Sequence, residues 1–396
     1  MAVRPNVRVR SAAVLLGVLG LCGGVSAQST GTATARPAAD DRAPRAPVYT
    51  AAEPAREASV YDTGEQIMLP CEKVWKAMCG SDLTQVSTEW LKQNAQKHEA
   101  EMAAGNVTIV DSGLRGAGIN IVFALGASVP AAALPAFSAA EAYIEAQFSD
   151  PITVTVSVNF ASMSPGVLGS TGSTYGYVSY AGSRTGIVNN RDATDTIQPY
   201  LPSGSTLAVR YNGNTGTITS ETRVFWTIAN YNSTVGTAGG TAASMTYNTN
   251  FSWDWDPSNG VGGSSFSFQD VIIHEVGHSL GFTSGADFRF NDLETLDLFR
   301  FQSTDGTGDY NPDTLAEFTS RPRLVDYNTP NDQHNSDLIS VEYRMSDGTP
   351  YQASHFREQT PSIGIMDPAL GYAQTFYPNF YRASDLAMFD AIGYDR

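Results

Sequence analysis

Residues 274–281 read His274-Glu275-Val276-Gly277-His278-Ser279-Leu280-Gly281. On an α-helix, residues four apart lie on the same face, because one turn takes 3.6 residues. His274 and His278 can therefore bind one metal ion through their neutral imidazoles, and this spacing favours zinc. Glu275 is free to act as a general base towards a water that the metal activates. The stretch predicts a catalytic zinc site.

The flanking residues predict a helix over residues 268–280. Ser267, with Asp270 three residues later, is typical of a helix start. Apolar side chains then recur at helical spacing, at Val271, Ile272, Val276 and Leu280. Gly281 favours a C-terminal end. The alternative, an ordinary helix that happens to hold two histidines, is weakened by this context.

Two histidines leave a catalytic zinc site incomplete, since such sites use three protein ligands and one water. The compact form of the motif has a third histidine six residues after His278, but Ser284 stands there. The remaining candidates are two downstream acids and two downstream histidines: Glu294, Asp287, His334 and His355. Of these, His355 precedes Met366 in Ile363–Pro368, and a tight methionine turn beneath the metal belongs to one zinc-protease architecture.

These residues resemble the leishmanolysin-type branch of the metzincin metallopeptidases, in which an insertion separates the zinc helix from the third histidine. A group of secreted bacterial relatives is also similar in four segments: Leu296–Phe301, Ser354–Phe356, Ile363–Pro368 and Asp385–Gly393. The resemblance covers roughly residues 265–396. The resemblance implies that His274, His278 and His355 bind Zn²⁺ and that Glu275 is the general base. Met366 would form the turn that supports the site. Ser284 is the departure from the compact motif, so the third ligand is an inference.

The resemblance implies an α+β fold with two lobes. The upper lobe would hold a twisted mixed sheet and the active-site helix, and the irregular lower lobe would end in a C-terminal helix. From the residues, strands at Ile119–Phe123 and Ile152–Val158, with a helix Ser138–Phe148 between them, predict a parallel βαβ unit. Further strands are expected at Leu207–Tyr211, Arg223–Ile228, Ala243–Tyr247 and Leu296–Phe301, and a final helix from Ser384 to about Ile392.

The chain divides into four expected regions. Residues 1–27 are a signal peptide, and 28–105 are a linker, a propeptide or an N-terminal cap. Residues 106–285 form the upper catalytic lobe with the zinc helix. Residues 286–396 form the lower lobe with the third ligand and the methionine turn.

The N-terminus predicts secretion. Arg4, Arg8 and Arg10 precede an apolar run that is too short to span a bilayer, and Val25-Ser26-Ala27 supplies small residues for cleavage. A lipidation site at Cys22 is the alternative. After cleavage Cys71 and Cys79 remain, and in an oxidising compartment a local disulfide is expected. The alternative is that one thiolate caps the zinc in a latent precursor.

The formal net charge of −16 argues against binding to nucleic acid or to anionic membranes. No later segment is long and apolar enough for a membrane helix. We therefore expect a secreted monomer whose partner is a protein or peptide substrate. Asp254–Gly260 is either a calcium loop, since hard cations need clustered oxygens, or a polar turn.

The sequence thus predicts a secreted zinc endopeptidase. Its substrate would bind extended along an edge strand, for which we expect the strand near Ala243–Tyr247. The phenol of Tyr372 is a candidate for stabilising the oxyanion. Two rival functions remain: a binding or adhesion protein with a structural zinc site, and a zinc hydrolase that acts on a non-peptide substrate.

Overall fold

The computed structural model describes residues 96–97, 100–114, 116, 118–192, 198–209, 219–285, 293–299, 324–325, 343–346, 351–356 and 361–396. All of them belong to one compact unit, Arg45–Arg396. The expected signal peptide and most of the expected linker region, up to residue 95, lie outside the described residues, as do Cys22, Cys71, Cys79, Asp287 and His334. No helix in the described part of the chain has the length and apolar character needed to cross a membrane.

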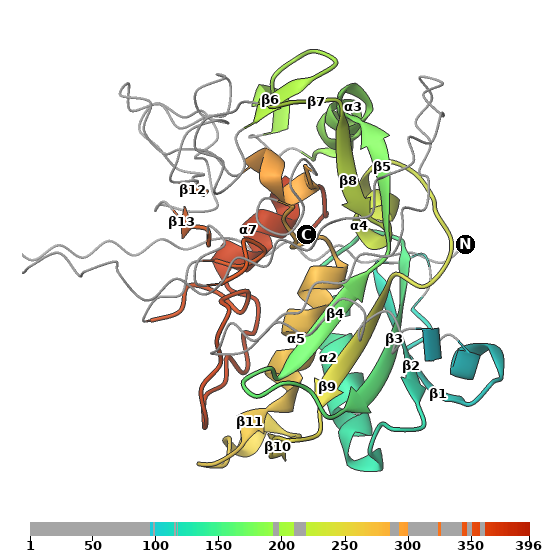
Figure 1. Ribbon diagram of the computed structural model, residues 1–396, viewed down its shortest axis with the longest axis vertical. Coiled ribbons are helices and arrows are strands. Elements are labelled where there is room, and N and C mark those ends of the chain that lie inside the picture. The colour runs from blue at the N-terminus through green and yellow to red at the C-terminus, as the bar shows by residue number, and fades with distance from the viewer. Residues whose placement is uncertain are drawn as a thin grey trace, which may run out of the picture. The chain divides into compact units, whose positions relative to one another are not determined.

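The fold is α+β and is built on a five-stranded mixed sheet (Figure 1). The strand order is β1-β2-β3-β9-β4, formed by Val107–Asp111, Asn120–Gly126, Thr153–Ala161, Ala243–Asn248 and Gly169–Ser173. Strands β2, β3 and β9 are parallel, and β1 and β4 pair antiparallel at the two edges. The predicted parallel unit is confirmed. Its helix α2 (Leu134–Glu145) begins before Ser138, because Pro135 fits the first turn, where no N–H is needed.

Helices α2 and α5 (Phe268–Ser279) pack against each other and against the sheet, α2 on β2 and α5 on β4. Helix α5 matches the predicted helix closely, and the hydroxyl of Ser267 accepts a hydrogen bond from the N–H of Asp270 as its N-cap. Every residue of α5 is buried, so the zinc motif lies inside the core.

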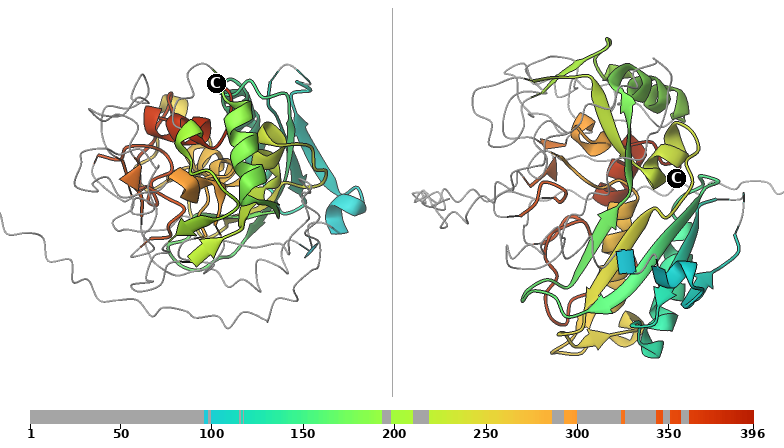
Figure 2. Two further views of the ribbon diagram at one scale, coloured as in Figure 1. Left: turned by 90° about the horizontal axis from the view of Figure 1, so that it is seen from above. Right: turned by 45° about the vertical axis from the view of Figure 1, so that its right-hand side comes forward.

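Beyond the end of β4, two further strands form a separate antiparallel pair (Figure 2). It joins β5 (Tyr175–Ser179) to β8 (Arg223–Thr227), with α3 (Tyr180–Asn190) and α4 (Ile228–Thr234) against them. Three small strand pairs complete the described sheets: β6 (Leu207–Val209) with β7 (Thr219–Glu221), β10 (Trp253–Asp254) with β11 (Phe266–Ser267), and β12 (Leu324–Val325) with β13 (Tyr343–Arg344). The 3₁₀ helices are Ala131–Ala133, Gln198–Tyr200, Pro257–Asn259 and Thr295–Phe299.

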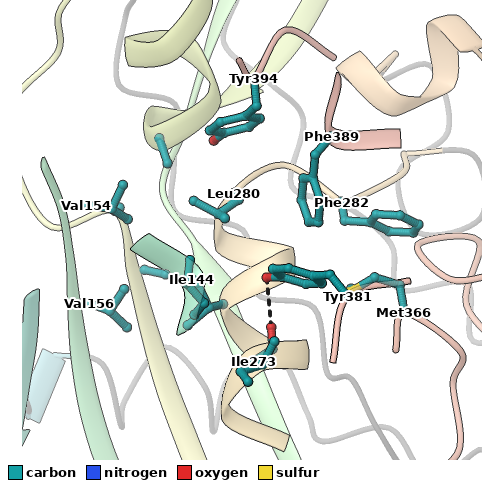
Figure 3. Packing of buried hydrophobic residues seen from close by; sticks show 14 of the residues in the cluster. Ile144, Val154, Val156, Ile273, Leu280, Phe282, Met366, Tyr381, Phe389 and Tyr394 are labelled. Atoms are coloured by element: carbon teal, nitrogen blue, oxygen red, sulfur yellow. Dashed lines mark hydrogen bonds between the residues drawn. The ribbon is translucent and has the colours of Figure 1, made fainter. Parts of the chain in front are cut away.

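The C-terminal segment covers the side of α5 that faces away from the sheet (Figure 3). Its helix α7 (Ala383–Ala391) contributes the fully buried Phe389, whose ring packs against those of Phe282 and Tyr381. The hydroxyl of Tyr381 donates to the carbonyl of Ile273 at 3.2 Å, directly before the first histidine. The final helix is therefore confirmed, and it packs against the side of α5 that faces away from the sheet.

Two predictions about strands are wrong. The expected strand Leu296–Phe301 is a 3₁₀ helix, because the carboxylate of Asp297 accepts the N–H groups of Gly285 and Glu294 and turns the chain. The expected substrate strand Ala243–Tyr247 is β9, which is paired on both sides, with β3 and with β4. Alternation of side chains cannot distinguish a central strand from an edge. In the described sheet, the edge beside α5 is β4.

The contribution of core packing to stability can be tested at Phe268. Its fully buried ring contacts five other aromatic rings: Phe137, Phe160, Tyr247, Trp253 and Trp255. We expect Phe268→Ala to lower the free energy of unfolding by about 3–5 kcal/mol through the cavity that it leaves. Urea denaturation would measure it. Ile109→Ala is the control, because Ile109 is 53% exposed and should change stability by no more than about 0.5 kcal/mol.

Candidate metal centre

Three buried histidines converge in the interior. One ring nitrogen from each of His274, His278 and His355 lies within 4.8 Å of those of the other two. Their ring centroids are 4.6, 5.3 and 5.1 Å apart for the pairs 274–278, 274–355 and 278–355. Among the described residues, these three side chains form a group that can bind a metal ion. The structure thus brings the remote His355 to the helix pair.

Main-chain carbonyls orient all three rings. The Nδ1 atoms of His274 and His278 each lie 2.7 Å from a carbonyl oxygen, those of Ile365 and Phe282. The Nδ1 of His355 lies 3.2 Å from the carbonyl of Gln352. A carbonyl oxygen only accepts, so each Nδ1 carries the ring proton and each Nε2 is the nitrogen that can bind a metal. Burial also lowers the pKa of His274 to about 4, so this ring is neutral near pH 7, the form that binds metals.

The nitrogens lie close enough together to bind one shared metal ion. The Nε2 atoms of His274 and His278 lie 2.9 Å apart. In a tetrahedral site with Zn–N bonds of about 2.0–2.1 Å, two ligand nitrogens lie about 3.3 Å apart. With the ring protons on Nδ1, both Nε2 atoms could bind the same metal ion. Three imidazoles also match the ligand count of catalytic zinc, which keeps its fourth position for water.

The chain leaves α5 through a turn that only glycine adopts easily. Gly281 has a φ of 108°, and a Cβ there would meet the Cβ of Asn230 at 3.0 Å. This turn lets the N–H of Phe282 donate to the carbonyl of Gly277 at 3.1 Å. It also brings the carbonyl of Phe282 back to the ring of His278. The glycine that ends the helix therefore also orients the second ligand.

Three hydrogen bonds fix the position of the segment that carries His355. They are made by Ser354, by His355 and by Phe356. Ser354 accepts the N–H of Ser284 through its hydroxyl at 3.0 Å. The carbonyl of His355 accepts the N–H of Ser346 at 3.0 Å, and the N–H of Phe356 donates to the carbonyl of Met366 at 3.0 Å. Ser284, which replaces the histidine of the compact motif, thus anchors the segment that supplies the ligand instead.

The methionine turn lies directly against the helix (Figure 3). The N–H of Asp367 donates to the carbonyl of Gly364 at 3.4 Å to close the turn, and Met366 is fully buried. A Cβ on Gly277, between the two histidines, would come within 2.5 Å of the Met366 sulfur. Gly277 therefore permits the close approach of the turn.

The carboxylate of Asp385 stabilises the methionine turn through hydrogen bonds to its backbone. It accepts the N–H groups of Ile365 and Met366 at 2.9 and 3.0 Å, and that of Arg382 at 2.7 Å, where it also caps α7. Burial raises the pKa of Asp385 to about 7, although these three donors favour the charged form. Since Ile365 in turn orients His274, Asp385 acts on the metal site through the backbone.

Glu275 is fully buried between α5 and the edge strand β4. Thr171 of β4 donates a hydrogen bond to the Glu275 carboxylate, and a Cβ on Gly169 would lie 2.9 Å from the same carboxylate. The side chain thus points to the strand, next to the first histidine in the sequence. It is not one of the side chains that form the metal group, as expected for a general base.

A small pocket opens beside His274. Apolar side chains line most of it, among them Leu168, Val271, Ile365, Leu370 and Phe376. Hydrogen bonds hold the segment with Phe376, which lines the pocket, against α5. The buried carboxylate of Asp270 accepts the hydroxyl of Thr375 and the N–H of Phe376. The pocket is therefore a shaped, mainly apolar cavity at the metal site.

Other candidates from the sequence lie elsewhere. Glu294 is buried, but its carboxylate accepts the hydroxyl of Tyr175 at 3.4 Å and is not part of the metal group. Tyr372 is 55% exposed, and its ring stacks on Phe266, just before the start of α5 and away from the end that holds His278. In the loop Asp254–Gly260, the two carboxylates accept backbone N–H groups of the loop itself and of Gly262, as in a polar turn.

The roles of Gly277, Asp385 and Thr171 were not predicted from the sequence. A glycine inside a helix costs about 1 kcal/mol relative to alanine, so Gly277 could have indicated close packing at this position. Asp385 lies at the start of the predicted final helix, and that position does not indicate a contact with the methionine turn. A threonine in a strand is ordinary, so Thr171 did not indicate a contact with Glu275.

Comparisons with known proteins do not identify the chain: no family model, no curated protein and no solved structure matches it.

We expect the protein to bind one zinc ion per chain and His355→Ala to weaken binding by about two orders of magnitude, because one of three ligands is lost. Metal analysis after dialysis and competition with a chelating dye would measure this. His98→Ala and His334→Ala change the two remaining histidines of the chain and should leave affinity unchanged. Retention of zinc by His355→Ala would remove this residue from the site.

Gly277→Ala tests the packing of the turn. In an ordinary helix this change would stabilise, but here the new Cβ meets the Met366 sulfur, so we expect a loss of about 1–3 kcal/mol in unfolding free energy. The double variant Gly277→Ala/Met366→Ala removes the clash. In that background, the alanine at position 277 should cost much less, and equal costs in both backgrounds would contradict the close approach.

Proposed function

We propose that this protein is a secreted zinc-dependent endopeptidase of the metzincin type, with its third ligand remote in sequence as in the leishmanolysin-like branch. One observation carries the proposal: His355 reaches the His274–His278 pair from a distant segment, while the buried Glu275, next to His274 in the sequence, is not part of the metal group. A purely structural zinc site usually has four protein ligands and does not need the carboxylate. The two-lobe architecture is part of the same proposal.

The chemistry follows from the residues around the metal. A zinc ion held by the three imidazoles would lower the pKa of a water to about 7 and polarise a substrate carbonyl. Glu275 would take the proton of that water and deliver it to the leaving amine. Its burial keeps bulk water away from the carboxylate, which strengthens its interactions with a bound substrate.

The edge strand β4 offers a place for an extended peptide. The carbonyl of Leu168 accepts the N–H of Asn248 in β9, and the N–H of Thr174 donates to the carbonyl of Ala242, directly before β9. Because bonding alternates along an antiparallel strand, Gly169, Thr171 and Ser173 direct their main-chain groups to the other edge. A substrate would pair with that edge, and one of its apolar side chains would enter the pocket beside His274.

Secretion, a monomeric state and a protein or peptide as the only partner remain predictions from the sequence. They fit the proposal, since an acidic zinc endopeptidase that acts outside the cell needs neither nucleic acid nor a membrane. The calcium ion that the Asp254–Gly260 loop suggested is not part of the proposal, because the loop carboxylates accept N–H groups.

Digestion of casein tests the function. We expect wild-type protein to cleave it, with cleavage blocked by a chelator and restored by zinc, and Glu275→Ala to lower kcat by about 10²–10⁴-fold while zinc stays bound. Full activity of Glu275→Ala would contradict the assigned base. A wild type that binds zinc but hydrolyses nothing would instead favour a binding protein, and hydrolysis of small esters without peptide cleavage would favour a non-peptide hydrolase.

A further inference from the structure

We propose that Thr171 is a positioning residue for Glu275, so that the edge strand β4 sets the orientation of the general base. This inference rests on the proposed function for its catalytic meaning. The contact itself can be tested without it.

The contact is specific and buried. The Thr171 hydroxyl lies 3.0 Å from the main-chain oxygen of Glu275 and also within hydrogen-bond distance of its Oε2 atom. A hydroxyl has one proton to donate, and the carboxylate is the stronger acceptor because it is charged. Both side chains are buried, with Thr171 1% and Glu275 0% exposed, so water does not replace this bond easily. One rotamer of the carboxylate is therefore favoured.

Two neighbours on β4 support the same arrangement. A Cβ on Gly169 would lie 2.9 Å from Oε1 of Glu275 and 3.2 Å from a methyl group of Val271, so a larger residue there would displace the carboxylate from its present position. The Ser173 hydroxyl donates to the carbonyl of His278 at 3.3 Å. Alternate residues of β4 thus contact α5 along the stretch that holds Glu275 and His278.

These are the residues whose main-chain groups face the free edge of β4. Thr171 would therefore contact Glu275 with its side chain and a bound peptide with its main chain. A substrate that pairs with the strand would stiffen the element that holds the base, and the base would be aligned only where the strand is in register. Threonine at 171 is in this sense a link between substrate binding and proton transfer.

The test compares Thr171→Val, which keeps the shape but removes the donor, with Thr171→Ser, which keeps the donor. We expect Thr171→Val to lower kcat on a casein-derived peptide about 10–100-fold, with KM changed less than about twofold and zinc retained. Thr171→Ser should restore kcat to within about threefold of wild type. Ser170→Ala removes a hydroxyl from the opposite face of the same strand and should leave kcat unchanged.

Activity is not the only readout. On zinc-loaded proteins at one fixed free zinc concentration, a double-mutant cycle of Thr171→Val and Glu275→Ala in urea should show coupling of about tenfold in the unfolding equilibrium constant. Thr171→Ala replaces Thr171→Val if the latter does not fold. A coupling factor near one, or equal kcat in Thr171→Val and Thr171→Ser, would overturn the inference. If the wild type cleaves no peptide while the coupling is present, the proposed function fails and the contact stands.

Discussion

Two imidazole nitrogens with lone pairs face each other at 2.9 Å in the interior, and the metal centre is organised around them. The carbonyls of Ile365 and Phe282 place the ring protons on Nδ1 and so leave the Nε2 atoms of His274 and His278 as acceptors. In this arrangement both nitrogens can bind one metal ion. The methionine turn and the exit from α5 each supply one of these carbonyls, so the protein positions the rings through its backbone.

Close packing around α5 requires residues without a Cβ. Gly277 admits the methionine turn, and Gly169 admits the carboxylate of Glu275. A glycine inside a helix costs about 1 kcal/mol, and burial of Met366 and Phe389 against the helix offsets it. The helix is thus less stable by itself than its apolar residues suggest, and it depends on the C-terminal segment for its support.

The sheet and the C-terminal segment act on opposite sides of the same helix. Strand β4 contacts Glu275, while Asp385 fixes the turn that orients His274. The proposed base and the proposed ligands are therefore held by separate elements. In a metzincin-type peptidase, this separation would let the substrate strand influence proton transfer without disturbing the metal.

Local pattern in the sequence was enough for α5, from its cap at Ser267 to Gly281, because capping and helical periodicity act between near neighbours. The parallel unit and the final helix followed in the same way. Which remote residue completes the metal group could only be inferred by resemblance, since the later Met366 distinguishes His355 from other loop histidines only for a reader who knows that architecture. The edge position of β4 and the contact of Thr171 with Glu275 could not be predicted. Strand order and contacts between distant segments come from how the whole chain buries its apolar surface, which no short window of sequence encodes.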